Sequence, residues 1–212
     1  YFYELSLERP RNVLIFDFGG GTLDITIMRL GDAHDRRVFA TGGIGIAGSD
    51  FDRAIIQKRL EAHFGKGSPG VDAEINRLID AIADWQVLPE ISTPQVKHSL
   101  EKAIRAGHAP MRLKALQSLI FNDLAFLFYN RVEEAKIRLS NTGTTILEMK
   151  EGDLNLWELY TRRQFEQDIA EHRRQIEECL RQTIAESGLQ IDEIEAVVKT
   201  GGSSSIPVYS RM

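Results

Sequence analysis

Three consecutive glycines lie between two acidic residues near the start of the chain. The segment Val13–Met28 reads VLIFDFGGGTLDITIM, with Asp17 before the glycines and Asp24 after them. Glycine lets the backbone turn tightly, and successive N–H groups in such a turn form a concave surface that suits phosphate oxygens. Because the aspartates would repel phosphate, we expect a divalent cation between them, and Mg2+ prefers such oxygen ligands. The alternative is an ordinary tight hairpin without a ligand.

A second glycine-rich segment, Gly42–Gly48, reads GGIGIAG and matches the dinucleotide-binding pattern G-x-G-x-x-G from its second glycine. That pattern requires a strand, a helix and a second parallel strand. Here the helix expected over residues 49–64 is followed by the loop GKGSPG and then by further helical sequence. We therefore expect a loop that leads into a helix capped by Ser49 or Asp50. The GKGS at Gly65–Ser68 lacks the first glycine of a phosphate-binding P-loop.

Composition excludes several classes of protein. The 212 residues carry a formal net charge of −5 and show no clustered positive face, so we expect no nucleic-acid partner. We expect no membrane association, because no apolar run approaches the roughly 18–20 residues that span a bilayer. The single cysteine, Cys179, excludes disulfide stapling and favours a reducing compartment such as the cytoplasm. The ends at Tyr1 and Met212 suggest cuts through a longer protein.

Hydrophobic periodicity predicts an alternation of strands and helices. The expected strands are 13–18, 23–30, 37–41 and a short buried strand at 195–200 that runs into the glycine turn Gly201–Ser203. A second hairpin is expected over 144–149 and 154–159, and helical sequence over 71–140 and from Thr161 to about 187. The long run 111–139 reads as one helix with a broad apolar face. The sequence leaves open whether the last helix is broken near 168–173, and Gly188 is expected to end it. The two glycine turns should lie at one edge of the same sheet.

Four segments resemble the DnaK family of heat-shock chaperone ATPases, in the same order along the chain. FDFGGGTLDITI at Phe16–Ile27 is similar to the family's second phosphate loop, and GGSSSIP at Gly201–Pro207 to its adenosine loop. AGSDFD at Ala47–Asp52 resembles the segment GGEDFD, and VEEAKIRLS at Val132–Ser140 the adenosine-contacting helix. Residues 65–128 match least and form a longer stretch than usual, as in a divergent, YegD-type member.

The resemblance implies an α/β fold, namely the second lobe of an actin-like ATPase domain. Residues 1–42 and 169–212 would form a ribonuclease-H-like base, subdomain IIA. Residues 43–168 would form a helical plus β-hairpin cap, subdomain IIB, with an enlarged helical insert.

The resemblance also implies a role for individual residues. Phosphates of ATP or ADP would be held by the backbone N–H groups and the hydroxyl of Gly19, Gly20, Gly21 and Thr22. Mg2+ would be held through water by Asp17 and Asp24, and Asp17 would also orient the attacking water. The ribose, base and α-phosphate would be contacted by Glu133, Lys136, Ser140, Gly201, Gly202 and Ser203. The alternative for Glu133 and Lys136 is a surface ion pair.

Two positions depart from the family pattern. The family stacks two arginines on the adenine, and Ile137 and Ser205 occupy those positions here. Each such cation–π contact contributes about 0.5–2 kcal/mol, so the preference for adenine is open. Arg138 does not replace them, because adjacent residues point about 100° apart on a helix.

The function that the resemblance implies is slow ATP hydrolysis coupled to protein folding. This chain would supply one half of the site, and its partners would be a first lobe upstream, unfolded polypeptides and co-chaperones. We expect the chain alone to be catalytically inactive. A sugar-kinase-like or polyphosphatase-like phosphotransferase of the same superfold is one alternative, and a degenerate, non-hydrolysing interaction scaffold is another.

Overall fold

The computed structural model describes residues 7–31 and 34–210, which form two compact units. The first unit comprises Tyr1–Asp50 and Ile169–Met212, and the second Phe51–Asp168. The base predicted from the sequence ends at residue 42, whereas the first compact unit continues to Asp50. The identification of the units with subdomains IIA and IIB stays a prediction. The sequence also predicts an irregular lead-in at 1–11 and a loop at 31–35, and part of each lies outside the described residues.

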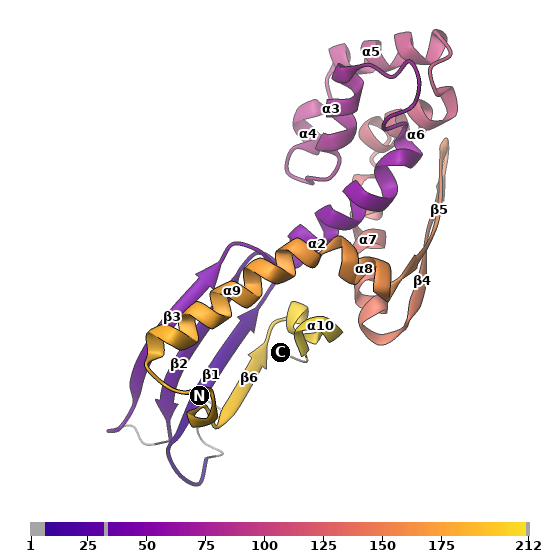
Figure 1. Ribbon diagram of the computed structural model, residues 1–212. Coiled ribbons are helices and arrows are strands. Elements are labelled where there is room, and N and C mark those ends of the chain that lie inside the picture. Colours follow the sequence, from indigo (N-terminus) through magenta and orange to yellow (C-terminus); the bar gives the residue numbers. More distant parts are fainter. Residues whose placement is uncertain (1–6, 32–33, 211–212) are drawn as a thin grey trace. The chain divides into compact units, whose positions relative to one another are not determined.

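A four-stranded sheet forms the first unit, in the order β3-β2-β1-β6. The bounds are β1 Arg11–Phe18, β2 Leu23–Leu30, β3 Arg37–Ile44 and β6 Ala196–Thr200. The first three strands are antiparallel neighbours, and β6 runs parallel to β1 (Figure 1). The next strand after β3 in the sequence, Thr144–Glu151, belongs to a separate two-stranded sheet, so the GGIGIAG segment is not part of a βαβ unit. The sequence-based rejection of a dinucleotide-binding fold is therefore confirmed.

One long helix, α9 (Ala170–Ser187), packs on the sheet against β2 and β3. A Cβ added to Gly42 would lie 2.0 Å from Oγ1 of the buried Thr183. Gly42 thus lets the helix approach the strand closely, and this packing explains one glycine of the GGIGIAG segment. Buried apolar side chains of β1 and β2 form the core of this unit: Val13, Leu14, Phe16, Phe18, Leu23, Ile25 and Ile27.

The expectation of a buried last strand is wrong. In β6 no residue is fully buried, and Val197 is 52% exposed. Within the described residues it is an edge strand of the sheet, and the helix α9 packs mainly against β2 and β3 and leaves the residues of β6 partly uncovered. The turn and short helix α10 (Pro207–Ser210) follow it.

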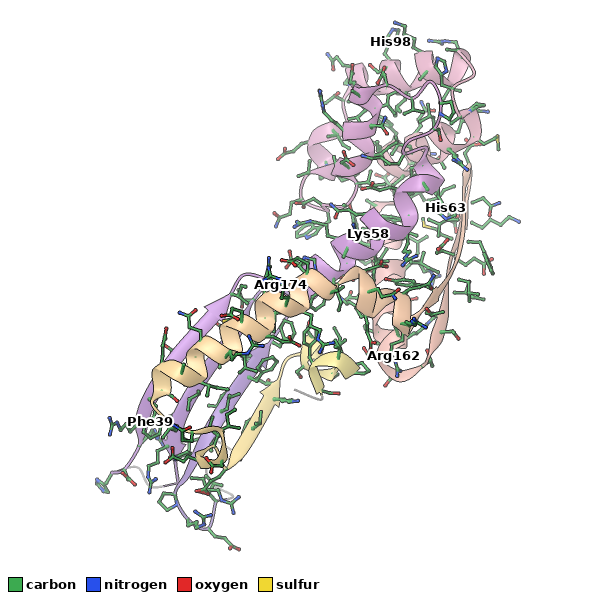
Figure 2. The ribbon with its side chains drawn as sticks, in the orientation of Figure 1. Phe39, Lys58, His63, His98, Arg162 and Arg174 are labelled. Atoms are coloured by element: carbon green, nitrogen blue, oxygen red, sulfur yellow. The ribbon has the colours of Figure 1, made fainter. Side chains whose placement is uncertain are left out.

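The second unit consists of helices and a two-stranded hairpin. Its elements are the later part of α2 (Gly48–Ile55), a π-helical segment Ile56–Leu60, a 3-10 segment Glu61–Phe64, α3 Ala73–Ala81, α4 Leu88–Ile91, α5 Pro94–Arg105, α6 Pro110–Phe121, α7 Ala125–Asn141, β4 Thr144–Glu151, β5 Leu154–Thr161 and α8 Arg162–Asp168. Arg162, labelled in Figure 2, donates hydrogen bonds to the carbonyls of Leu139, Ser140 and Thr142. It thereby satisfies carbonyls that the end of α7 leaves without helical partners. No helix of the described residues is long and apolar enough to cross a membrane.

The predicted single helix over 111–139 is wrong. The chain breaks between α6 and α7, where Asp123 has a φ of 55°. Leu116 and Phe128 are buried as expected, but Leu124 and Leu127 are partly exposed. Periodicity continues across the break by chance of spacing, so the sequence pattern alone could not reveal it.

Other predicted helix ends are confirmed. The hydroxyl of Thr161 accepts a hydrogen bond from the N–H of Gln164, whose side chain in turn accepts the N–H of Thr161. This reciprocal arrangement is a capping box at the start of α8. The helical segment is interrupted at Ile169, between α8 and α9. Gly188 follows the last residue of α9 and has a φ of 71°.

Glu61 is a buried acid in the second unit. Its Oε1 has no hydrogen-bond partner among the described residues, and Nζ of Lys66 lies 4.0 Å from Oε2. Burial raises the pKa of this carboxyl from an ordinary 4.5 to about 7, because the charged form loses its hydration.

The raised pKa of Glu61 predicts a pH-dependent stability. The carboxyl of Glu61 keeps its proton to about pH 7 in the folded chain, whereas it releases the proton near pH 4.5 in the unfolded chain. The protonated carboxyl therefore contributes its full stabilisation of the folded state below pH 4.5, and this contribution is lost as the pH rises through 7. We expect Glu61→Gln to raise the free energy of unfolding at about pH 8 and to change it much less at about pH 5. Urea denaturation at both pH values measures this, with the exposed Glu90→Gln as control. An equal effect of Glu61→Gln at both pH values would contradict the prediction.

Candidate functional site

The first glycine turn connects β1 to β2 in a tight hairpin. Asp17 and Asp24 are directly opposite each other in the register of the two strands, and both are exposed. The hydroxyl of Thr22 donates to Oδ2 of Asp24 at 3.0 Å, and the N–H of Gly19 donates to the carbonyl of Thr22 at 3.1 Å. The hairpin itself thus orients Thr22 and one of the carboxylates.

The two opposed carboxylates constrain the chemistry of this turn. Like charges directly opposite each other on neighbouring strands destabilise a sheet. Both side chains face solvent at the end of the hairpin, beside a turn of three glycines. Oxygen ligands that remain open to water suit Mg2+, which keeps several of its waters when it binds beside phosphates. The residues therefore fit a hydrated divalent cation.

The second glycine turn lies against the first, as the sequence predicted. Thr200, the last residue of β6, pairs with Asp17 in the parallel register. Gly201 has a φ of 82°, and a Cβ added there would lie 2.2 Å from the carbonyl oxygen of Phe18. Ser203, which is buried, donates from Oγ to the carbonyl of Gly19 at 2.7 Å. The two turns are therefore in backbone contact within one unit.

A third segment supports the first turn, and sequence reasoning missed this role. The N–H of Ser49 donates to the carbonyl of Gly20 at 2.8 Å, and the N–H of Gly48 to that of Gly19 at 3.4 Å. The carboxylate of Asp50 accepts the N–H of Ala47 at 2.9 Å. Because α2 begins at Gly48, Ser49 and Asp50 both lie inside the helix, and the expectation that one of them is its N-cap is wrong. The glycine spacing of Gly42–Gly48 was the only signal, and it suggested a different ligand site.

The structure places the remaining predicted residues on α7, in the second unit. Glu133 is exposed, whereas Lys136 is buried and its Nζ donates to Oδ2 of Asp52 at 2.6 Å. The hydroxyl of Ser140 donates to the carbonyl of Lys136 at 3.4 Å. The spacing of three and four residues puts all three on one side of the helix.

Asp52 is the half-buried partner of Lys136, and sequence reasoning did not single it out as a site residue. Its Oδ1 has no hydrogen-bond partner among the described residues. Burial raises the pKa of Asp52 to about 6, and the nearby charge of Glu133 adds to this rise, although Lys136 opposes it. The only signal in the sequence was its place at the end of the AGSDFD segment.

Both departures from the family pattern are exposed. Ile137 on α7 leaves 54% of its surface exposed, and Ser205 lies on the exposed side of the second glycine turn. Arg138 approaches Glu134 at 3.5 Å and points to a different side of α7 from Ser140.

The close backbone contact at Gly201 predicts a clear difference between neighbouring glycines. We expect Gly201→Ala to lower the free energy of unfolding by about 1–3 kcal/mol, because it adds a steric clash to a left-handed backbone conformation. Gly202→Ala is the matched control, since a Cβ added there meets no atom within 4 Å. Chemical denaturation measures both variants. Equal stability of the two would show that the turns are not in contact.

The partly buried ion pair predicts a measurable coupling between Asp52 and Lys136. We expect Asp52→Ala and Lys136→Ala each to destabilise the chain by removing this ion pair, with a coupling energy of about 1–3 kcal/mol in a double-mutant cycle. The exposed pair of Arg181 and Glu178 provides a control cycle and should show a smaller coupling. Additive effects of the two substitutions would contradict the ion pair.

Comparison with known proteins places this geometry in a family. The chain matches the family model described as Hsp70 protein over residues 3–84 and 125–211. It is 24% identical to a chaperone protein dnaK of Cyanidioschyzon merolae, over 99% of this chain and 28% of that protein. It is 25% identical to the DnaK of Deinococcus proteolyticus, over 99% of this chain and 27% of that protein, and also 25% identical to the DnaK of Thermus thermophilus, over 99% and 28%.

The match is interrupted at residues 85–124, which contain α4, α5 and α6. This interval lies within the stretch 65–128, which we expected from the sequence to resemble the family least. The YegD-type assignment stays a prediction. The chain spans 27–28% of the length of these relatives. Its mixed α/β architecture is that of an actin-like ATPase lobe, as predicted. The chain belongs to the Hsp70 family.

Proposed function

We propose that this chain is the second lobe of the ATPase domain of an Hsp70-type chaperone, and that it binds the phosphates of Mg-ATP and Mg-ADP. The observation that carries the proposal is the contact between the two glycine turns beside the exposed, opposed Asp17 and Asp24. An isolated hairpin would not need a second glycine turn fastened to its backbone.

On the phosphate side of the proposed site, the glycine turn and Thr22 bind the phosphates and the two aspartates bind the metal ion. The N–H of Gly19 is used inside the turn, so Gly20 and Gly21, which are exposed, offer their N–H groups to the β- and γ-phosphates. The hydroxyl of Thr22 completes this cradle. Asp17 and Asp24 hold Mg2+ through its waters, and Mg2+ supplies charge neutralisation at the phosphates when it is bound.

The nucleoside side involves the second glycine turn and α7. Gly201 and Gly202 pass close to the α-phosphate and ribose, while Ser203 holds the turn in place. Glu133 and Ser140 contact the ribose and base. Lys136 starts from an ion pair with Asp52, so its contact with the nucleoside requires exchange of that partner or a shared position.

The chain alone offers one side of a phosphoryl-transfer site. Such catalysis depends on positioning and on charge stabilisation around the transferred group. The proposal therefore places the opposing phosphate loop in a first lobe of the longer protein. The relatives are named chaperone proteins, which supports a chaperone role. The proposal adds that the longer protein couples slow hydrolysis to protein folding in the cytoplasm, with unfolded polypeptides and co-chaperones as partners.

A non-hydrolysing scaffold is the second candidate, and one observation favours it. An exposed isoleucine and an exposed serine stand where the family uses adenine-stacking arginines. Family membership argues against the sugar-kinase-like alternative. Binding of nucleotide by the longer protein separates the two remaining functions.

The test is a titration of the full-length protein with ATP, ADP and GTP, with and without Mg2+. We expect magnesium-dependent binding of ATP that Asp17→Asn weakens by at least about tenfold, corresponding to about 1.4 kcal/mol. Asp192→Asn is the matched control, because Asp192 is exposed and lies before β6, at the end of that strand opposite to the second glycine turn. Slow hydrolysis should require the full-length protein.

Two outcomes would overturn the proposal. The absence of any magnesium-dependent nucleotide binding by the full-length protein would leave the scaffold. Measurable ATP turnover by this chain alone, in pure form, would contradict the assignment of the opposing half-site to a first lobe.

A further inference from the structure

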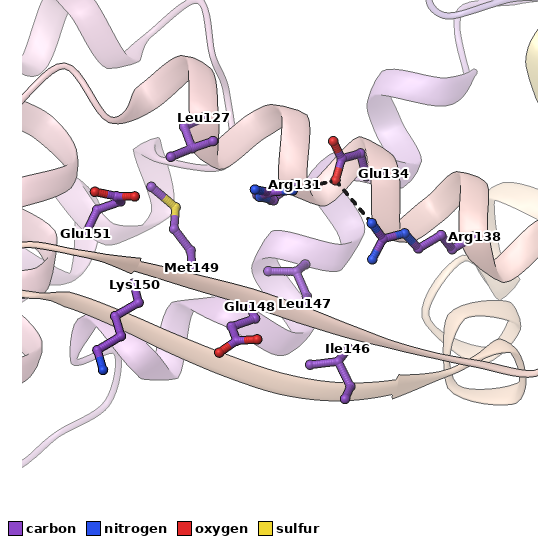
Figure 3. A pocket seen from close by; sticks show the side chains of 10 residues that line it. All are labelled: Leu127, Arg131, Glu134, Arg138, Ile146, Leu147, Glu148, Met149, Lys150 and Glu151. Carbon is purple, nitrogen blue, oxygen red and sulfur yellow. Dashed lines mark hydrogen bonds and ion pairs between the residues drawn. The ribbon is translucent and has the colours of Figure 1, made fainter.

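A groove in the second unit lies between α7 and the free edge of β4, the edge that does not pair with β5. It has a volume of about 410 Å3, and its lining on the helix is Leu127, Arg131, Glu134 and Arg138. On the other side it is lined by the whole run 146–151 of β4 (Figure 3). Inward-facing and outward-facing residues of a strand both line a space only where that space lies along the edge of the strand.

The edge of β4 offers unpaired backbone groups to this groove. The hairpin has a two-residue loop, Gly152–Asp153, and Gly152 has the positive φ that a type II′ turn needs. The pair that flanks such a loop is hydrogen-bonded, so Glu151, Met149 and Leu147 direct their N–H and C=O groups to β5. The alternate residues Ile146, Glu148 and Lys150 direct theirs outward, and β5 is the only strand that pairs with β4 among the described residues.

The helical wall of the groove has an excess of positive charge. Arg131 donates to Oε2 of Glu134 at 2.8 Å, and Arg138 approaches the same oxygen at 3.5 Å. One carboxylate is shared by two guanidinium groups, so this wall carries a net charge of about +1 while all three side chains remain half exposed. An acidic side chain that enters the groove can complete the pairing.

The outer face of the hairpin has a different character. Ile146 is directly opposite Leu159, and Trp157 comes two residues before Leu159 in β5. All three are about half exposed. A strand added beside β4 would therefore place alternate side chains next to the arginines on one face and next to Ile146, Glu148 and Lys150 on the other, with Leu159 and Trp157 one strand further away on β5.

We propose that this groove binds an extended peptide segment of a partner protein, in which acidic and apolar residues alternate, by adding it as a strand to the edge of β4. Main-chain hydrogen bonds to Ile146, Glu148 and Lys150 supply affinity, and Arg131 and Arg138 select the acidic residues. The groove lies about 160° around the axis of α7 from Glu133, Lys136 and Ser140. The inference is therefore independent of the nucleotide site.

The first experiment measures binding of fluorescein-labelled six-residue peptides to the full chain by fluorescence anisotropy. The probe alternates Glu and Val, and a peptide that alternates Lys and Val has the same length and β-propensity. We expect the Glu peptide to bind at least about tenfold more tightly, because only it complements the arginines. Arg131→Ala and Arg138→Ala should each weaken binding about three- to tenfold. Arg163→Ala, an exposed arginine of α8 outside the groove, should leave it unchanged.

The second experiment tests strand addition itself. Two Glu-Val peptides are N-methylated on alternate residues, one at every Glu and the other at every Val. In an added strand every second residue bonds to β4, so one of these peptides should lose binding about tenfold or more and the other should retain it. Amide hydrogen exchange should slow at Ile146, Glu148 and Lys150 when the unmethylated peptide is bound.

Several results would overturn the proposal. They are equal binding of the Glu and Lys peptides, equal behaviour of the two methylated peptides, an effect of Arg163→Ala as large as that of Arg131→Ala, or no binding at about millimolar peptide. A dimer of the chain in sedimentation that Arg131→Ala converts to monomer would assign the groove to a second copy instead.

Discussion

The first unit depends on a single backbone acceptor, the carbonyl oxygen of Gly19. It receives the hydroxyl of Ser203 and the N–H of Gly48, so it connects three loops that are far apart in the sequence. The parallel pairing of β1 with β6 brings Ser203 to this point, and the antiparallel β3 brings Gly48. A tight contact of this kind tolerates no side chain at Gly201. Packing therefore explains Gly201, whereas a Cβ added to Gly20, Gly21 or Gly202 would meet no atom within 4 Å.

The second unit contains a buried charged residue, Lys136 of α7, which forms an ion pair with Asp52 of α2. Lys136 and Asp52 neutralise each other in a setting that raises the pKa of the aspartate to about 6. A lysine whose charge is already paired contributes less to the recognition of a ligand. The exposed Ile137 and Ser205 remove two further cations from the proposed nucleoside side. All the residues that the resemblance implies for the proposed phosphate side are present in the sequence.

Much of the fold and of the candidate site could be predicted from residue types and spacing. The spacing of apolar residues located the hairpin of β1 and β2 and the hairpin of β4 and β5. The signals at Thr161 and Gly188 located helix ends. All these features depend on neighbours in the sequence. The break between α6 and α7 and the exposure of β6 could not be predicted in this way. Both depend on which elements cover which faces, and a one-dimensional pattern does not contain that information.

By itself, the sequence determined the local chemistry of this protein: a glycine turn between aspartates, a second glycine turn after a strand, and segments that resemble one chaperone family. Tertiary structure alone decided which of these residues are in contact. It joined Gly201 and Ser203 to Gly19, assigned Ser49 to the support of the turn, and gave Lys136 the partner Asp52. The reason is physical, since hydrogen bonds and ion pairs between distant residues exist only after strand pairing and burial of the core have brought them into contact.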